Sequence, residues 1–272
     1  MVEAPDTFRR PMIDPALDIV LLLAAAAFIA GFVDSIAGGG ALITTPALLL
    51  AGFGPVEALG TNKLQGLFGS GSATIAYAAK GHVDVTSQLP SALLSFLGSV
   101  AGAALATILP GEILRIILPF MLVAIAIYFA LKPDTGELES ARRMTPFLFA
   151  MTIVPLIGFY DGVFGPGTGS FFMLAFVALQ GFAVLKATAN TKFLNFASNL
   201  GGFAAFAVAG AISWKVGLVM GVGQFLGAKA GAGLAMRAGA RLIKPLLIVV
   251  CIAMTIRLLI DPTHPLRVLI GW

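Results

Sequence analysis

Charged residues are scarce in this chain of 272 residues, because Asp, Glu, Lys and Arg together make up only 11% of it. Soluble globular domains carry about a quarter charged residues. Hydrophobic residues account for 58% of the chain, and the mean hydropathy is +0.98. A soluble domain of this length has too little interior to hide so much apolar surface, so lipid must surround most of the molecule. The composition therefore predicts a membrane protein.

Cysteine and histidine are nearly absent. Cys251 is the one cysteine, so neither an intrachain disulfide nor a multi-cysteine metal site can form. His82 and His264 are the two histidines, and both lie beside loop or tail signals. The sequence contains no His-Glu-x-x-His metal motif, no Gly-x-Ser-x-Gly nucleophile elbow and no Gly-Lys-Ser/Thr phosphate loop. We therefore expect no metal, no other cofactor and no enzyme, and direct use of ATP would need a separate subunit.

Lysine and arginine do not form a basic patch, although the net charge is +4. The 17 basic residues stand at the ends of apolar runs, as the loop-flanking cations of membrane proteins do. They are not interleaved with stacking aromatic residues. This distribution is typical of residues that set the orientation of a protein in a bilayer, and it argues against a nucleic-acid partner.

Long apolar runs make up most of the chain. Their approximate bounds are 17–36, 41–53, 61–79, 87–109, 113–131, 146–163, 168–182, 189–209, 213–236 and 241–260. A membrane-spanning helix needs about 20 apolar residues, so the runs at 41–53 and 168–182 are too short to cross unaided. The predicted fold is an all-α polytopic membrane protein with about 8–10 transmembrane segments, including two short broken or re-entrant helices.

A polar linker divides the chain into two transmembrane repeats between two tails. The predicted parts are an N-terminal tail at 1–16, a first repeat at 17–131, the linker at 132–145, a second repeat at 146–260 and a C-terminal tail at 261–272. Arg9 and Arg10 before an apolar run have the outline of a cleavable signal. That run leads into Asp34 and a glycine cluster with a counterpart in the second half, so we assign it to the fold.

The two halves align residue by residue. An offset of 127 places Gly31 on Gly158 and Asp34 on Asp161. After a two-residue insertion the offset becomes 129, and Thr61-Asn62-Lys63 then falls on Asn190-Thr191-Lys192. Duplication of this extent is common among secondary transporters, whose substrate lies between the repeats. The repeats are parallel or inverted according to whether each half crosses the membrane an even or odd number of times, which the sequence leaves open.

Glycine clusters interrupt both halves after an aspartate, as Asp34-Ser-Ile-Ala-Gly-Gly-Gly and Asp161-Gly-Val-Phe-Gly-Pro-Gly. Helix breaks at membrane depth leave N–H groups that an anion can bind, so Gly39, Gly40 and Gly167 are candidate substrate contacts. The alternative is that the glycines only form tight turns that the aspartates cap. Asp34 and Asp161 are candidates for proton coupling, for pairing with lysines or for capping the broken helices.

A second polar constellation begins each of two long apolar runs. Its candidate substrate-binding residues are Thr61, Asn62, Lys63, Gln65, Asn190, Thr191, Lys192, Asn195 and Asn199. Thr191, Asn195 and Asn199 recur every four residues, as one face of a helix requires. The lysines either extend toward the lipid headgroups or, with the amides and hydroxyls around them, form a pocket for a small oxyanion that suits a metal cation poorly.

These motifs also carry a family resemblance. The order Gly31-Phe-Val-Asp34 with a triple glycine, then Gly60-Thr61-Asn62-Lys63, then Asn190-Thr191-Lys192, resembles the sulfite exporter TauE/SafE family over about residues 17–260. The resemblance implies a multi-pass protein of the bacterial inner membrane that exports or carries sulfite, an organosulfonate or a related sulfur-containing anion, driven by an ion gradient. Pro166 and Thr168 interrupt the second glycine cluster, so the two halves of the site are not identical.

The expected function is secondary transport of a small anion by alternating access, with the site between the repeats. The expected partners are the anion, the lipid bilayer, a coupling proton or cation and a second copy of the chain. Glycine pairs such as Gly98 with Gly102 and Gly227 with Gly231 predict close contacts between helices, which suit a monomer and a dimer equally. The alternatives are an intramembrane hydrolase with an aspartate pair, a channel, or a membrane subunit of a larger complex.

Overall fold

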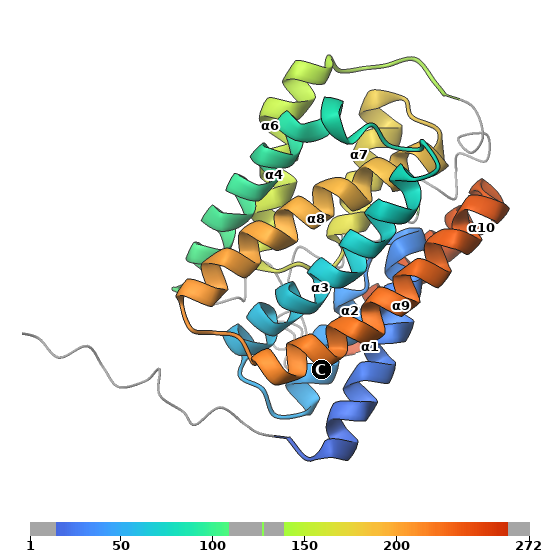
Figure 1. Ribbon diagram of the computed structural model, residues 1–272. Coiled ribbons are helices and arrows are strands. Elements are labelled where there is room, and N and C mark those ends of the chain that lie inside the picture. The colour runs from blue at the N-terminus through green and yellow to red at the C-terminus, as the bar shows by residue number, and fades with distance from the viewer. Residues whose placement is uncertain (1–14, 109–126, 128–138, 261–272) are drawn as a thin grey trace, which may run out of the picture.

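The computed structural model describes residues 15–108, 127 and 139–260, and the regular structure in these residues is entirely α-helical (Figure 1). The helices are α1 (Leu17–Ala37), α2 (Ala41–Leu50), α3 (Pro55–Ala78), α4 (Val85–Ala106), α6 (Pro146–Val163), α7 (Thr168–Gln180), α8 (Val184–Val208), α9 (Trp214–Ala238) and α10 (Ala240–Ile260). Almost all of the predicted run at 113–131 and of both tails, and half of the linker, lie outside the described residues.

Most helices begin where the apolar runs predict, but α3 and α8 begin earlier. The predicted starts were 61 and 189, whereas the helices start at Pro55 and Val184. Their first turns contain Glu57 and Lys186, and these charged residues interrupt the apolar pattern from which the starts were predicted. Helix α3 also begins with Pro55, and proline favours the first turn of a helix because it has no N–H to leave unpaired. Lys63 and its equivalent therefore lie about two turns inside their helices.

Four of the described helices are long and apolar enough to cross a membrane, namely α1, α4, α6 and α9. They expose large apolar side chains such as Leu22, Leu93, Phe147 and Val222, as lipid-facing helices do. The 24 residues of α3 and the 25 of α8 also suffice for a span of about 36 Å. Neither is apolar enough to be identified as a span from its hydropathy, because both carry many polar side chains. Those side chains are buried against neighbouring helices.

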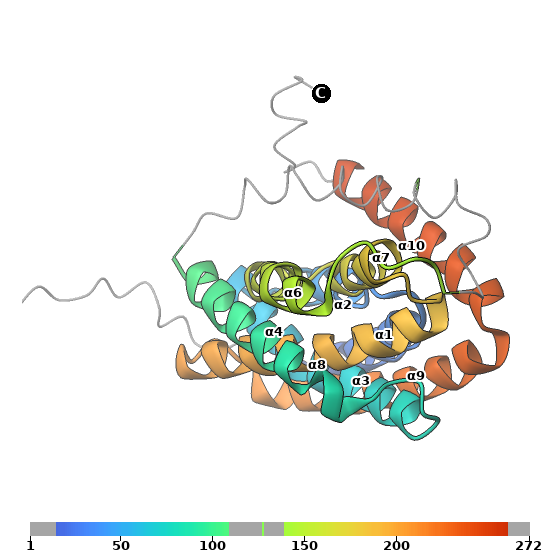
Figure 2. The same cartoon turned by 90° about the horizontal axis from the view of Figure 1, so that it is seen from above.

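The two halves of the chain are interleaved rather than set side by side. Helix α1 packs along α9, and α6 packs along α4, as Figure 1 and Figure 2 both show. Helix α3 packs on α9 and α8 on α4, while α3 and α8 contact each other. The first helix of each half therefore packs on the fourth helix of the other half, and the α3–α8 contact also joins the two halves.

Glycines make these contacts close. A Cβ on Gly102 would overlap the carbonyl oxygen of Phe159 in α6, and a Cβ on Gly227 would overlap that of Phe28 in α1. Gly98 and Gly231 meet the same two helices in the same way. The predicted glycine pairs therefore serve contacts within one chain. The offsets of 127 and 129 that align the halves also relate these contacts to one another.

Both predicted helix breaks are present. Helix α1 ends at Ala37, and Gly38 and Gly39 then adopt φ values of 82° and 95° before α2 begins. Helix α6 ends at Val163, and Gly165 and Gly167 both have a φ of 85° before α7. Only glycine enters this left-handed region without strain. At 10 and 13 residues, α2 and α7 reach roughly 15 and 20 Å, too short for a bilayer core of about 30 Å.

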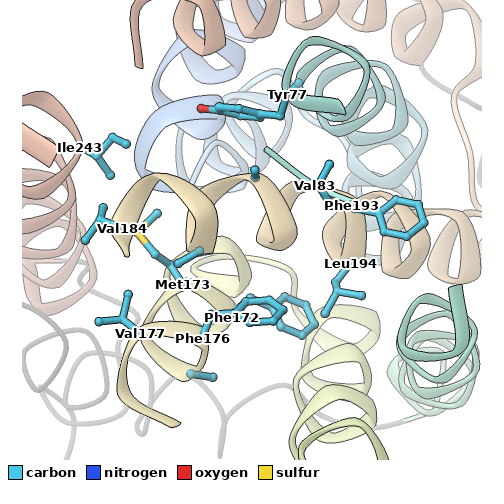
Figure 3. Packing of buried hydrophobic residues seen from close by; sticks show 14 of the residues in the cluster. Tyr77, Val83, Phe172, Met173, Phe176, Val177, Val184, Phe193, Leu194 and Ile243 are labelled. Carbon is cyan, nitrogen blue, oxygen red and sulfur yellow. The ribbon is translucent and has the colours of Figure 1, made fainter. Parts of the chain in front are cut away.

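An apolar core holds α7 in place behind its break. Figure 3 shows Phe172, Met173 and Phe176 of α7 among Leu194 of α8 and Ile243 of α10. The hydroxyl of Tyr77 in α3 donates a hydrogen bond of 2.9 Å to the carbonyl oxygen of Ser35, near the end of α1. These contacts fix the two helix breaks relative to α3 and α8, on which the polar residues lie.

Candidate functional site

Two buried ion pairs connect the halves of the chain. The Nζ of Lys63 in α3 lies 2.8 Å from Oδ1 of Asp161 at the end of α6. The Nζ of Lys192 in α8 lies 3.0 Å from Oδ2 of Asp34 at the end of α1. Each pair therefore joins a lysine of one half to the helix break of the other half. The remaining ion pair among the described residues, Lys186 with Glu139, is exposed.

The interpretation of the lysines as headgroup-seeking side chains is wrong. Lys63 is 1% exposed and Lys192 is 0% exposed, and each ammonium contacts a carboxylate instead of pointing outward. A Cβ on Gly165 would lie 3.3 Å from Nζ of Lys63, and one on Gly169 would lie 3.3 Å from Nζ of Lys192. Glycine at these two positions lets the ammonium groups reach the helix breaks.

The aspartates pair with lysines and also contact the starts of the short helices. Asp34 Oδ1 accepts a hydrogen bond of 3.1 Å from the backbone N–H of Gly40, the residue that caps α2. Asp161 Oδ1 accepts one of 2.8 Å from the side-chain hydroxyl of Thr168, the first residue of α7. Both carboxylates therefore pair with lysines, and only Asp34 also accepts a backbone N–H at a helix start, as a capping carboxylate does.

A polar pocket lies where these groups meet. Its lining residues are Asp34, Gly39, Ala41, Asn62, Gly66, Asp161, Gly165, Gly169, Asn195, Asn199 and Gln224. Its volume is about 20 Å³, measured as the space open to the centre of a water molecule. One water needs roughly 10–15 Å³ on this measure. The pocket in this conformation therefore has room for about one water molecule.

The carboxylates, and not the ammonium groups, line the pocket. Lys63 and Lys192 are absent from the lining, whereas Asp34 and Asp161 belong to it. We had expected both lysines to face a central cavity, but each is screened from the pocket by its aspartate. Because two positive and two negative charges meet here, the site as a whole is neutral.

Three of the predicted amides reach the pocket. Asn62 Oδ1 accepts hydrogen bonds from the hydroxyl of Thr44 at 2.7 Å and from the amide of Gln65 at 2.6 Å. Asn199 Nδ2 donates to the carbonyl oxygen of Asn195 at 2.8 Å, and Asn195 Oδ1 has no partner among the described residues. The lining thus combines amide groups with carboxylates and glycine backbone.

The other candidate residues lie just outside the lining. The hydroxyl of Thr61 accepts a bond of 3.0 Å from the N–H of Ser213 and so ties α3 to the start of α9. Asn190 donates to the carbonyl oxygen of Lys186 in its own helix at 2.8 Å. Thr191 is fully buried, and its Oγ1 has no partner among the described residues. Gly167 caps α7. None of these four residues belongs to the pocket lining.

Gln224 is a pocket residue that sequence reasoning missed. It comes from α9, is 4% exposed and has an unpartnered Oε1 within the described structure. Gly31 and Gly69 make room for it, because a Cβ on either would press against its side chain. The aligned residue of the first half, Ser95, instead donates to the carbonyl oxygen of Leu194 at 3.0 Å. The signal in the sequence that could have identified Gln224 was a single amide side chain within an apolar span.

The charged groups of the site are arranged as separate ion pairs. No group of three or more His, Cys, Asp or Glu residues suited to a metal occurs in the part of the chain that the structure describes. Each pocket carboxylate is bound to its own lysine. An aspartate-pair hydrolase needs two carboxylates that share a proton. In such an arrangement a buried ammonium group can release its carboxylate and bind another anion instead.

Comparison with known proteins gives consistent matches. The family model for the sulfite exporter TauE/SafE proteins matches residues 23–258. The chain is 64% identical to "Probable membrane transporter protein ORF9" of Sinorhizobium sp over 96% of its length and the whole of that protein. It is 46% identical to "Probable membrane transporter protein YfcA" of Escherichia coli K12 over 92% of each. A more distant relative, "Probable membrane transporter protein YunE" of Bacillus subtilis, is 26% identical over 79% of this chain and 88% of its own. No solved structure matches.

Proposed function

The chain belongs to the sulfite exporter TauE/SafE family of membrane transporters, and from this premise we propose that it is a secondary transporter of a small anion. The proposed substrate class is sulfite, an organosulfonate or a related sulfur-containing anion. The observation that carries the proposal is the pair of buried lysines, each held by an aspartate of the other half beside one shared polar pocket. A hydrogen bond from a buried ammonium group to an anion is about twice as strong as one between neutral groups.

The interleaved helices support alternating access as the mechanism. We propose that the halves are two repeats related by a pseudo-twofold axis, since the α1–α9 and α6–α4 contacts are equivalent under the sequence offsets. A site at the junction of two such repeats is exposed to one side or the other as they rock. The short helices α2 and α7 then act as the broken helices whose starts face the substrate.

The pocket is too small for the proposed substrate in this conformation. An anion of four or more heavy atoms exceeds a space that fits about one water. Binding therefore requires the helices to separate or an ion pair to open. A saturable carrier behaves in this way, whereas a channel keeps a continuous path. The inner membrane of a bacterium is the proposed location.

The test is transport by purified protein in liposomes, with sulfite and short alkylsulfonates as substrates. Lys63→Ala and Lys192→Ala should each abolish saturable uptake while the protein remains monodisperse. Lys186→Ala is the matched control, since Lys186 lies on the same helix as Lys192 but is exposed and paired with Glu139. It should leave uptake unchanged. Full uptake by either buried-lysine variant would overturn the proposed site, and absence of flux in the unmodified protein would overturn the function.

A further inference from the structure

The two aspartates of the site are not equivalent. Both oxygens of Asp34 are occupied, Oδ1 by the N–H of Gly40 and Oδ2 by Lys192. In Asp161 both contacts fall on Oδ1, which receives the hydroxyl of Thr168 and lies beside Lys63. Its Oδ2 is buried and has no partner within the described residues. Asp161 therefore has a vacant acceptor oxygen and Asp34 does not.

The two ion pairs use the carboxylate oxygens differently. Lys192 donates to Oδ2 of Asp34, whose Oδ1 already accepts the N–H of Gly40. Lys63 lies 2.8 Å from Oδ1 of Asp161, the oxygen that also accepts the hydroxyl of Thr168. A proton can therefore bind Oδ2 of Asp161 without displacing a partner, and it neutralises the charge that holds Lys63. A proton on Asp34 would have to compete with Lys192 or Gly40.

We propose that Asp161 binds a proton on Oδ2 when an anion binds, so that the anion replaces the carboxylate as the partner of Lys63 and is carried together with that proton. This inference rests on the proposed transport function and names its coupling ion. The one covalent change is the protonation itself, in which an O–H bond forms at Oδ2 as one breaks in a hydronium ion of the aqueous phase. The Lys63–Asp161 ion pair then opens, and an ammonium–anion pair forms. A monoanion and one proton together leave the charge of the site unchanged.

The charge inventory explains why a proton is needed. Lys63 and Lys192 are the ammonium groups at the site, and both are already neutralised by carboxylates. A further anion would add an uncompensated charge to a buried pocket, which is strongly unfavourable. Protonation of one carboxylate removes that excess.

Among the residues that the structure describes, no other charged group facing Asp161 can take this role. Of the helices packed on α6, α4 and α7 contain no charged residue, and α8 contributes Lys192 and the exposed Lys186. From α3 and α1 come Lys63 and Asp34, while the neighbouring Tyr160 hydroxyl is bonded to the carbonyl oxygen of Pro166. Glu57 and Asp18 lie in the first turns of their helices, far along the chain from the breaks.

The first test is equilibrium binding of a short alkylsulfonate to purified protein, because this probe keeps a single charge between about pH 5 and 9. In the range where Asp161 is ionised, linkage to one proton makes the apparent Kd rise tenfold per pH unit. Asp161→Asn should flatten this dependence, because the neutral amide leaves Lys63 available at every pH. Glu139→Gln is the matched control and should keep the slope, because Glu139 also pairs with a lysine but is exposed and is not part of the pocket lining.

The second test is proton movement in liposomes that contain a pH-sensitive dye. An inward sulfonate gradient should acidify the interior in the unmodified protein and not in Asp161→Asn. A flat pH dependence of binding in the unmodified protein, a retained slope in Asp161→Asn, or loss of the slope in Glu139→Gln would each overturn the proposal. Saturable sulfonate flux without proton movement would overturn the coupling and leave the transport function standing. The binding test decides the matter even if Asp161→Asn does not transport.

Discussion

The Nζ of Lys192 lies 3.0 Å from Oδ2 of Asp34, so that the second half of the chain holds the helix break of the first half. The same carboxylate accepts the N–H of Gly40 at the start of α2. One buried charge pair therefore connects the packing of the two halves to the geometry of a helix start. A change in either member should affect both stability and binding.

Lys192→Met should destabilise the protein by about 3–5 kcal/mol, because it leaves the carboxylate of Asp34 buried without its counter-charge. Adding Asp34→Asn should recover much of this loss, since the remaining group is neutral, while transport stays abolished. Thermal unfolding in detergent measures the first effect and liposome uptake the second. Lys186→Met at the exposed pair should change stability by less than about 1 kcal/mol. Equal losses in the single and double variants would show that the pair carries no net attraction.

The helix breaks were predictable from sequence because they rest on local chemistry. Gly38, Gly39, Gly165 and Gly167 take φ values that only glycine adopts easily, and the breaks occur where these glycines cluster. The burial of the lysines was not predictable in the same way. A lysine near the start of an apolar run reads as a headgroup contact until the helix is known to begin at Pro55 and not at residue 61.

The choice of ion-pair partner also lay beyond the sequence. Symmetry allows Lys63 to pair with Asp34 of its own half as well as with Asp161 of the other half. The observed choice follows from the interleaving of α1 with α9 and of α6 with α4, which is a long-range property of packing. Gln224 escaped notice because its aligned partner, Ser95, gave no polar pattern to match.

Gly227→Ala should destabilise the protein by about 1–3 kcal/mol, because the added methyl group would overlap the carbonyl oxygen of Phe28 and push α9 away from α1. Gly233→Ala on the same helix is the control. Its methyl group meets no atom within 4 Å, so improved helix propensity should stabilise by up to about 1 kcal/mol. Thermal unfolding of both variants measures the difference. Equal effects of the two changes would mean that the α1–α9 contact is not tight in solution.

Gly165→Ala should lower both stability and transport. Its φ of 85° costs an alanine about 1–2 kcal/mol, and the methyl group would lie 3.3 Å from Nζ of Lys63. Gly54→Ala supplies the control, since this residue has a φ of −63° and open space around its Cβ position. Its unfolding temperature and uptake should match those of the unmodified protein. Unchanged uptake in Gly165→Ala would show that the second helix break does not position the site.

Gln224→Leu should weaken anion binding about 10- to 100-fold, because a hydrogen bond from an amide to a charged ligand contributes about 1.5–3 kcal/mol. The side chain lines the pocket, and its Nε2 amide group can donate to an anion there. Ser95→Ala at the aligned position of the first half is the control, because Ser95 is absent from the pocket lining and bonded to Leu194. Titration of both variants with a short alkylsulfonate measures the affinities. If Ser95→Ala weakened binding as much as Gln224→Leu, the ligand would contact both halves equally, and the asymmetry of the pocket would have no part in recognition.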